Sequence, residues 1–336
     1  HAFRPSPCPQ SSRSSATPQR IGQRVRMKRL PVDVKLANLL PLGFICVVMG
    51  TIWSVYTTLH LIPLLQIGVP DQLQDMDRAQ RGSFQVLASQ LLTALFSICY
   101  ARAILTSPGS IPDSAEWRMG LSDTESELWT REVKVTGERR HCKWCLKYKP
   151  DRCHHCRVCK TCVLKMDHHC PWIMNCVGWG NHKYFFLVVV YAVLSCAFIF
   201  VTVLESVQDS VYMDVPHINR FLLVFCTTLS FIMGSLMTVF LSFHTWLMTK
   251  AMTTIEFCEK TSAAPHSFSK YDRGLWENIK VVLGPRPLLW FVPLDPARGD
   301  GIHHHSVSMG LCASIGGPPA WDLHAEGKSA APEFSR

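Results

Sequence analysis

The sequence predicts an all-α polytopic membrane protein, with four transmembrane helices and a small cytosolic, loop-rich domain that holds two zinc ions. Hydrophobic residues make up 48% of the 336 residues, and charged residues only 18%. The apolar residues gather in four long runs, and eight of the fifteen cysteines lie in one short segment between the second and the third run. The runs predict the membrane spans, and the cysteine cluster predicts the zinc domain.

The four apolar runs contain no Asp, Glu, Lys or Arg, and each has at least 18 residues. As a helix, a run of that length crosses a hydrocarbon core of about 30 Å. A single run is also compatible with a buried helix of a soluble protein, but four in one chain indicate membrane spans. The expected spans cover residues 39–62, 84–101, 184–204 and 221–248.

Lys and Arg residues are distributed unevenly between the connecting segments. The segment before the first run carries eight, the middle loop fourteen and the C-terminal part nine, whereas the two short loops carry only Arg78, Arg81 and Arg220. Because positive residues concentrate on the cytosolic side of membrane proteins, we expect both termini and the middle loop to lie in the cytosol. The net charge of +9 then reflects topology and attraction to the lipid bilayer, and no nucleic-acid partner is inferred.

These boundaries divide the chain into six regions. The two tails lack an apolar pattern and are rich in Ser, Pro or Gly, which indicates disorder. The residues before Met27 are interpreted as part of such a tail or as translated leader sequence. The expected regions are a basic tail (1–36), the first two helices (37–105), a cysteine-rich zinc domain (106–183), the last two helices (184–248), a cytosolic C-terminal region (249–296) and a second tail (297–336).

The cysteine cluster has the spacing of a zinc-binding domain. Pairs of the type Cys-x2-Cys occur at 142/145, 156/159 and 159/162, with four histidines interleaved. Such a pair directs two thiolates at one ion, and more distant ligands complete a tetrahedron. Because a cytosolic loop is kept in reducing conditions, the spacing favours zinc over a disulfide framework.

Two closed zinc sites require eight ligands, which the cluster can supply as two Cys3His sets. This choice uses six cysteines and two histidines, and it leaves Cys153 and Cys170 over. The eight cysteines of the cluster would also supply eight ligands for two zinc sites, but this choice leaves every histidine of the loop without a ligand role. The two expected sets are Cys142, Cys145, His155 and Cys162, and Cys156, Cys159, His169 and Cys176.

A Cys170 outside the zinc sites has a chemical use. A thiol becomes a good nucleophile when a nearby imidazole accepts its proton and a carboxylate orients that imidazole. Asp167, His168 and Cys170 supply this trio within four residues. In the alternative interpretation, Cys170 is a third-site or substitute zinc ligand and Asp167 is a surface charge.

Residues 142–185 resemble the cysteine-rich domain of the DHHC family of protein S-acyltransferases, the palmitoyltransferases. The resemblance rests on CKWCLKYKPDR, on HCRVCKTC, on DHHCPW at 167–172 and on NCVGWGNHKYF. It implies four spans, two structural Zn²⁺ ions and an acyl group carried by Cys170. It also implies transfer from a long-chain acyl-CoA such as palmitoyl-CoA to cysteines of cytosolic or membrane-associated substrate proteins.

Three shorter motifs extend the resemblance, and three residues depart from it. TTIE at 253–256 resembles the family's TTxE motif, and the segment 271–284 resembles its C-terminal motif with Asn278 as the buried polar residue. Leu283 stands there in place of an aromatic residue. Ser107 replaces the usual Asp of a DPG motif, and Cys153 replaces a small residue without a thiol. Cys153 is therefore inert, a competing ligand or an acylation site.

Four further residues are expected to contact acyl-CoA. The basic residues Lys149, Arg152 and His154 can meet the CoA phosphates, or alternatively lipid headgroups. Trp172 is expected to pack against the start of the acyl chain. The main rival function is a membrane-anchored zinc scaffold, of the kind found in ubiquitin-ligase adaptors, that uses all its Cys and His residues as ligands. A transporter is less favoured, because the spans lack charged residues.

Overall fold

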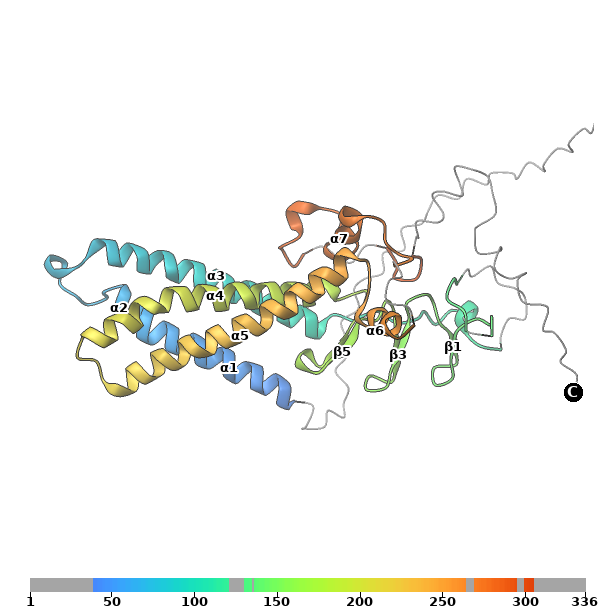
Figure 1. Cartoon of the computed structure of the whole chain (residues 1–336), viewed down its shortest axis with the longest axis horizontal. Coiled ribbons are helices and arrows are strands. Elements are labelled where there is room, and N and C mark those ends of the chain that lie inside the picture. Colours follow the sequence, from blue (N-terminus) through green and yellow to red (C-terminus); the bar gives the residue numbers. More distant parts are fainter. Residues whose placement is uncertain (1–38, 121–129, 135, 264–268, 295–298, 305–336) are drawn as a thin grey trace, which may run out of the picture.

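The computed structural model describes residues 39–120, 130–134, 136–263, 269–294 and 299–304. The tail expected over 1–36 lies outside these residues, as does the second tail from 305 onward. Four helices in the described part are long and apolar enough to cross a membrane, which confirms the four expected spans. They form one elongated bundle, and the cysteine-rich domain lies at one end of it (Figure 1).

The first span is built from three consecutive helical segments. They are α1 (Leu40–Tyr56), a π-helical stretch (Thr57–Leu61) and the short α2 (Ile62–Leu64). Pro63 explains the change of winding, since its ring has no N–H to donate and collides with the carbonyl group four residues earlier. A local π-helix relieves this clash, and the N–H of Ile62 accordingly donates to the carbonyl of Thr57.

The other three spans are longer than the apolar runs that predicted them. α3 covers Met76–Leu105, α4 His182–Tyr212 and α5 His217–Thr249. The sequence contains a start signal for α3, because the side chain of Asp75 accepts hydrogen bonds from the backbone of the first turn. Beyond the runs, the helices carry charged residues that pair with one another, and Arg81 lies 3.2 Å from Glu205.

The cysteine-rich domain consists of three small antiparallel hairpins arranged in a row (Figure 1). The first joins β1 (His141–Cys142) to β2 (Lys147–Tyr148), and the second joins β3 (His154–Cys156) to β4 (Thr161–Val163). The third joins β5 (His168–Cys170) to β6 (Asn175–Val177) through a 3₁₀ turn (Pro171–Ile173). These strands are too short to stabilise a sheet alone, so the hairpins require cross-links.

Two buried asparagines attach the third hairpin to the end of α3. The side-chain amide of Asn175 donates to the carbonyls of Ala103, Ile104 and Thr106 at 3.0–3.1 Å. The amide of Asn181 donates to the carbonyl of Ala103 as well. The last carbonyls of a helix have no partner within the helix, so these contacts satisfy them. They also fix the third hairpin against the mouth of the bundle.

The segment after α5 contains α6 (Thr254–Ala263) and α7 (Leu275–Leu283). Asn278 of α7 is buried, accepts a hydrogen bond from the N–H of Arg273 and donates to the carbonyl of Thr249. Leu283 is buried in an apolar cluster, so an aliphatic side chain fills the place where an aromatic was expected. Short 3₁₀ turns complete the described elements at Asp71–Leu73, Ala115–Trp117 and Pro287–Leu289.

Candidate active site and metal centres

The structure brings the first expected zinc set together around one point. The imidazole Nδ1 of His155 lies 3.4 Å from the sulfur of Cys142, 3.3 Å from that of Cys145 and 3.8 Å from that of Cys162. All four ligand atoms lie within 4.8 Å of one another. A tetrahedron with Zn–S of about 2.3 Å and Zn–N of about 2.0 Å has edges of about 3.5–3.8 Å. The four residues therefore fit a zinc ion.

The second set has the same geometry. The Nδ1 atom of His169 lies 3.6 Å from the sulfur of Cys156 and 3.5 Å from those of Cys159 and Cys176. The sulfurs of Cys159 and Cys176 are also 3.5 Å apart. Each set takes two thiolates from one hairpin and a histidine and a cysteine from the next. Two zinc ions would therefore link the three hairpins into one domain.

The three hairpins repeat at an interval of fourteen residues. A search of the sequence for zinc ligands alone does not reveal this repeat. A His-Cys pair begins the repeat at 141, 155 and 169, and a left-handed residue occupies the turn of each hairpin, at Leu146, Lys160 and Met174. The second cysteine of the pair is present at 145 and 159, but Ile173 takes its place in the third hairpin. Cys170 thus occupies a ligand position whose partner cysteine is missing.

Cys170 is buried and belongs to neither of the two metal clusters. It lies in an apolar cluster with Ala103 of α3 and Tyr184 and Phe185 of α4. The thiol is therefore placed where the cysteine-rich domain meets the membrane helices. An acyl chain attached there can enter the apolar interior of the bundle.

His168 connects Cys170 to Asp167. The Nδ1 of His168 donates to Oδ2 of Asp167 at 2.6 Å, which leaves Nε2 to interact with the Cys170 thiol. Burial disfavours protonation of His168, but its bond to Asp167 and the neighbouring Cys170 outweigh this and raise the imidazole pKa to about 9. Burial also disfavours charge on Asp167, but the bond from His168 holds the carboxyl pKa below its usual range. The arrangement favours a protonated, oriented imidazole beside Cys170.

Residues far away in the sequence surround Asp167. The backbone N–H and the hydroxyl of Thr254 donate to its two oxygens at 2.9 Å and 2.8 Å. His182 and His244 are also buried and bring ring nitrogens within 4.8 Å of the carboxylate. The TTIE motif at 253–256 was recognised from the sequence, whereas neither histidine was predicted to lie near Asp167. Each lies at the end of an apolar run, where nothing in a single sequence distinguishes it from a buried structural histidine.

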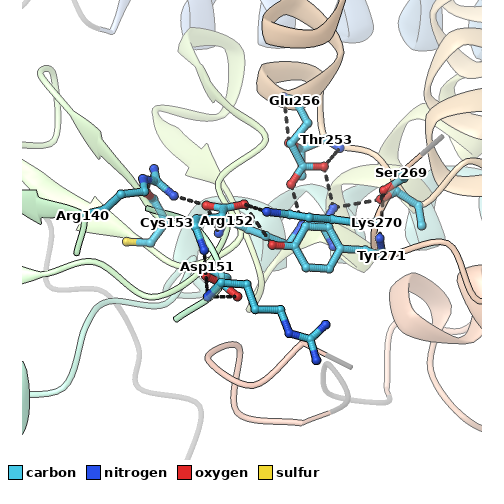
Figure 2. A network of polar contacts seen from close by, with 12 residues as sticks. Arg140, Asp151, Arg152, Cys153, Thr253, Glu256, Ser269, Lys270 and Tyr271 are labelled. Carbon is cyan, nitrogen blue, oxygen red and sulfur yellow. Dashed lines mark hydrogen bonds and ion pairs between the residues drawn. The ribbon is translucent and has the colours of Figure 1, made fainter. Parts of the chain in front are cut away.

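A buried polar network joins the second hairpin to the segment that follows α5 (Figure 2). The guanidinium of Arg152 donates to both carboxylate oxygens of Glu256, at 2.6 Å and 2.8 Å. Its plane lies over the ring of Tyr271, and the hydroxyl of Tyr271 donates to Glu132 at 2.9 Å. Glu132 also pairs with Arg140. The network therefore holds the zinc domain against α6 and the C-terminal region.

The four residues expected to contact acyl-CoA lie in different environments. Trp172 is 47% exposed beside Phe44 of α1, at the mouth of the bundle. Lys149 is half-buried in the zinc domain, whereas Arg152 is only 3% exposed and engaged with Glu256. Burial and the nearby Arg140 lower the pKa of His154 to about 4, so its imidazole is neutral. The phosphate contacts stay predictions, and Lys149 is the most available of the three basic groups.

Cys153 is fully buried in the apolar cluster of the first metal site. It lies in neither four-ligand set, and its burial separates it from the membrane-facing surface. Cys153 was expected to be inert, a competing ligand or an acylation site, and the geometry favours the inert role.

Comparison with known proteins places this site in a family. Residues 135–261 match the model of the DHHC palmitoyltransferase family. Palmitoyltransferase ZDHHC15A of Danio rerio is 33% identical over 263 residues, which cover 70% of this chain and 76% of that protein. Palmitoyltransferase ZDHHC15 of Homo sapiens is 28% identical over 286 residues (78% and 80%). Probable protein S-acyltransferase 16 of Arabidopsis thaliana is 36% identical over 236 residues (64% and 79%).

Proposed function

Because this chain belongs to the DHHC palmitoyltransferase family, we propose that it is a protein S-acyltransferase that works through an acyl thioester on Cys170. The acyl donor is a long-chain acyl-CoA such as palmitoyl-CoA, and the acceptors are cysteines of cytosolic or membrane-associated proteins. One observation carries the assignment of the residues. Cys170 lies outside both metal clusters, next to a His168 that is oriented by a buried Asp167.

In the first step, His168 takes the proton of the Cys170 thiol, and the thiolate attacks the carbonyl carbon of the acyl-CoA thioester. The bond from the acyl carbon to the sulfur of CoA then breaks, and the leaving thiolate receives the proton from His168. The negative charge of Asp167 stabilises the imidazolium in between. The raised pKa of His168 supports this role, because the proton resides on the imidazole while the thiolate reacts.

In the second step, a substrate cysteine gives its proton to His168 and attacks the acyl carbon on Cys170. The bond to Cys170 breaks, and the free enzyme is restored. One thioester is exchanged for another in each step, so little net energy is required and the protein needs only to lower the barrier. A covalent intermediate of this kind predicts ping-pong kinetics.

Two zinc ions would have a structural role. The sets that contain His155 and His169 supply four protein ligands each, which leaves no open position for substrate. When bound, such ions supply cross-links that the short hairpins lack. The chain's own residues then perform the chemistry.

The membrane location follows from the chemistry of the acyl group. A 16-carbon chain exposes apolar surface worth about 0.8 kcal/mol per CH₂, so the four helices can shelter it from water. We place both termini and the zinc domain in the cytosol, as the Lys and Arg distribution indicates. Trp172 and Phe44 then lie where the chain would enter the bundle.

The test compares Cys170→Ser with the wild-type protein. We expect the variant to lose both labelling by a fluorescent acyl-CoA and transfer to a substrate protein, because a hydroxyl is a far weaker nucleophile than a thiolate. Its zinc content should stay at two ions per chain, measured by plasma emission spectrometry. Cys156→Ser is the matched control, since it replaces the equivalent cysteine of the second hairpin and should release zinc.

Loss of zinc from Cys170→Ser would contradict the nucleophile assignment and favour a membrane-anchored zinc scaffold. Full labelling of the same variant would place the acyl group on another residue. Hydroxylamine treatment of the wild-type acyl-enzyme adds a chemical check, because it cleaves thioesters under mild conditions.

A further inference from the structure

A cavity of about 510 Å³ lies between the cysteine-rich domain and the segments that follow α5. Its walls come from the zinc domain, the first residue of α4, the end of α5, α7 and residues 299–304. The catalytic trio does not line it, but His182 does. The volume falls within the range of about 300–1,000 Å³ that is typical of small-molecule sites. It is much larger than one water molecule needs, which is about 30 Å³.

Several basic side chains face this cavity, and two of them have buried ring nitrogens without a hydrogen-bond partner among the described residues. Lys165 is 5% exposed, and the carboxylates of Glu256 and Asp167 interact electrostatically with its amine. The Nδ1 atom of His182 and the Nε2 atom of His304 are also buried without a hydrogen-bond partner in the described part of the chain. Buried donors without partners are costly. These two nitrogens and the buried Lys165 amine around one cavity indicate a ligand that forms hydrogen bonds with them.

The charges around the cavity favour an anion. Arg152 is neutralised by Glu256, and the one carboxylate in the lining, Asp300, accepts a hydrogen bond from His303 at 2.6 Å. Lys165 and the exposed Arg273 remain as cations. A phosphate group matches this set, because its several oxygens accept hydrogen bonds from separate donors and its charge compensates a buried ammonium.

We propose that this cavity binds a phosphate monoester, held by Lys165, His182 and His304, with Arg273 at its rim. The proposal concerns binding and does not depend on the acyltransferase mechanism. Burial and the nearby Arg152 lower the pKa of the Lys165 amine to about 7, while Glu256 and Asp167 act in the opposite direction. Bound phosphate would add negative charge beside the amine and favour its charged form.

The position of the cavity identifies two sources for the phosphate. Met248 near the end of α5 and Met252 just after this helix line it, so it lies near the depth of the lipid headgroups at the membrane surface. A bilayer lipid with a phosphorylated headgroup can reach this level. A soluble phosphate ester, including the 3′-phosphate of CoA, can reach it from the cytosol.

Binding would also affect the catalytic trio through His182. This imidazole borders the cavity, and one of its nitrogens lies within 4.8 Å of the Asp167 carboxylate and of a His244 nitrogen. A ligand that accepts a hydrogen bond from His182 fixes the ring that supports Asp167. Occupancy is therefore expected to change the rate of acyl-enzyme formation.

The test measures binding of phosphatidylinositol 4-phosphate to the full chain by native mass spectrometry. Phosphatidylcholine with the same acyl chains is the reference lipid. We expect one tightly bound molecule of the phosphorylated lipid and about tenfold or greater weakening in Lys165→Met, since a lost charged contact of this kind corresponds to at least a factor of ten. Lys160→Met is the matched control, because both lysines have left-handed backbone conformations but Lys160 is exposed.

Competition identifies the source of the phosphate. Displacement of the lipid by inorganic phosphate or by CoA, but not by dephospho-CoA, supports the site and assigns it to a soluble ester. Retention of the lipid in the presence of inorganic phosphate and of CoA supports the site and assigns it to the lipid headgroup. Equal binding of phosphatidylcholine, or unchanged affinity in Lys165→Met, overturns the proposal. If Lys165→Met does not retain two zinc ions, Arg273→Gln replaces it as the test variant. Unchanged lipid affinity in Arg273→Gln then overturns the proposal.

Discussion

The second and third hairpins of the zinc domain have the same local structure and different chemistry. In both, a His-His-Cys strand pairs with its partner in the same register, with His155 opposite Cys162 and His169 opposite Cys176. The cysteine of the first strand is a zinc ligand at Cys156 and the proposed nucleophile at Cys170. Two of the differences between these hairpins bear on the chemistry. Ile173 replaces the second cysteine of the pair, and Asp167 stands where the second hairpin has Cys153.

The comparison teaches how a catalytic cysteine can arise from a structural one. Without a partner thiolate, Cys170 belongs to neither Cys3His set, and the next element along the chain is the helix α4 rather than a further hairpin. The preceding carboxylate accepts a hydrogen bond from His168 and orients its ring. Zinc ions in the two ligand sets would join the hairpins, and we propose that the third hairpin then presents an activated thiol in place of a metal ligand.

The largest effect is expected from zinc removal, which acts on both hairpins. Treatment with 1,10-phenanthroline should unfold the zinc domain and abolish acylation, because structural zinc supplies about 10–16 kcal/mol to such domains. Thiol alkylation followed by mass spectrometry should show all six ligand cysteines becoming reactive together. Reaction of Cys170 alone under these conditions would show that the hairpins do not depend on the metal.

Restoring the missing cysteine should make the third hairpin behave like the second. In Ile173→Cys, the new thiol should converge with Cys170, as the sulfurs of Cys156 and Cys159 do. Oxidation should then close a disulfide and stop acyl-enzyme formation, and dithiothreitol should restore it. Ile173→Val is the control for the change in the buried apolar side chain, and it should stay active under oxidising conditions. Insensitivity of Ile173→Cys to oxidation would show that the two hairpins differ in backbone geometry.

The carboxylate that distinguishes the third hairpin can be tested by Asp167→Asn. The change removes the charge that stabilises the His168 imidazolium, and we expect the rate of acyl-enzyme formation to fall about 100-fold or more. Zinc content should not change, because Asp167 belongs to neither zinc set. Single-turnover labelling with acyl-CoA measures the rate. A rate within a factor of three of wild type would remove Asp167 from the mechanism.

The smallest effect is expected at the equivalent position of the second hairpin. Cys153→Ala deletes one buried sulfur atom, for which we expect a loss of stability of about 1 kcal/mol. Acylation and zinc content should remain at wild-type values. A loss of one zinc ion in this variant would identify Cys153 as a ligand, and a loss of one acyl group per chain would identify it as an acylation site.

Features coded by local pattern could be predicted from the sequence. The four uncharged runs predicted the spans because the requirement for about 18 apolar residues is local. The zinc sets followed from spacing because a Cys-x2-Cys turn is short. The helices extend beyond the runs because their ends lie outside the apolar stretch, where Asp75 and paired charges stabilise them.

Features that depend on contacts between distant segments could not be predicted in the same way. Arg152 looked like a group for CoA phosphates, yet it is buried against Glu256, 104 residues further along the chain. His182 and His244 approach Asp167 only because α4 and α5 end beside the third hairpin. No spacing rule connects such positions, since the fold brings them together.

The contact between Thr254 and Asp167 has a consequence for the synthesis and membrane insertion of the protein. Asp167 is synthesised early, but the residue that holds its two oxygens follows the fourth span by a few residues. A chain still on the ribosome with only three helices inserted has its nucleophile and lacks the support for its orienting carboxylate. Under the proposed mechanism, we therefore expect acyl transfer to begin only after membrane insertion is complete.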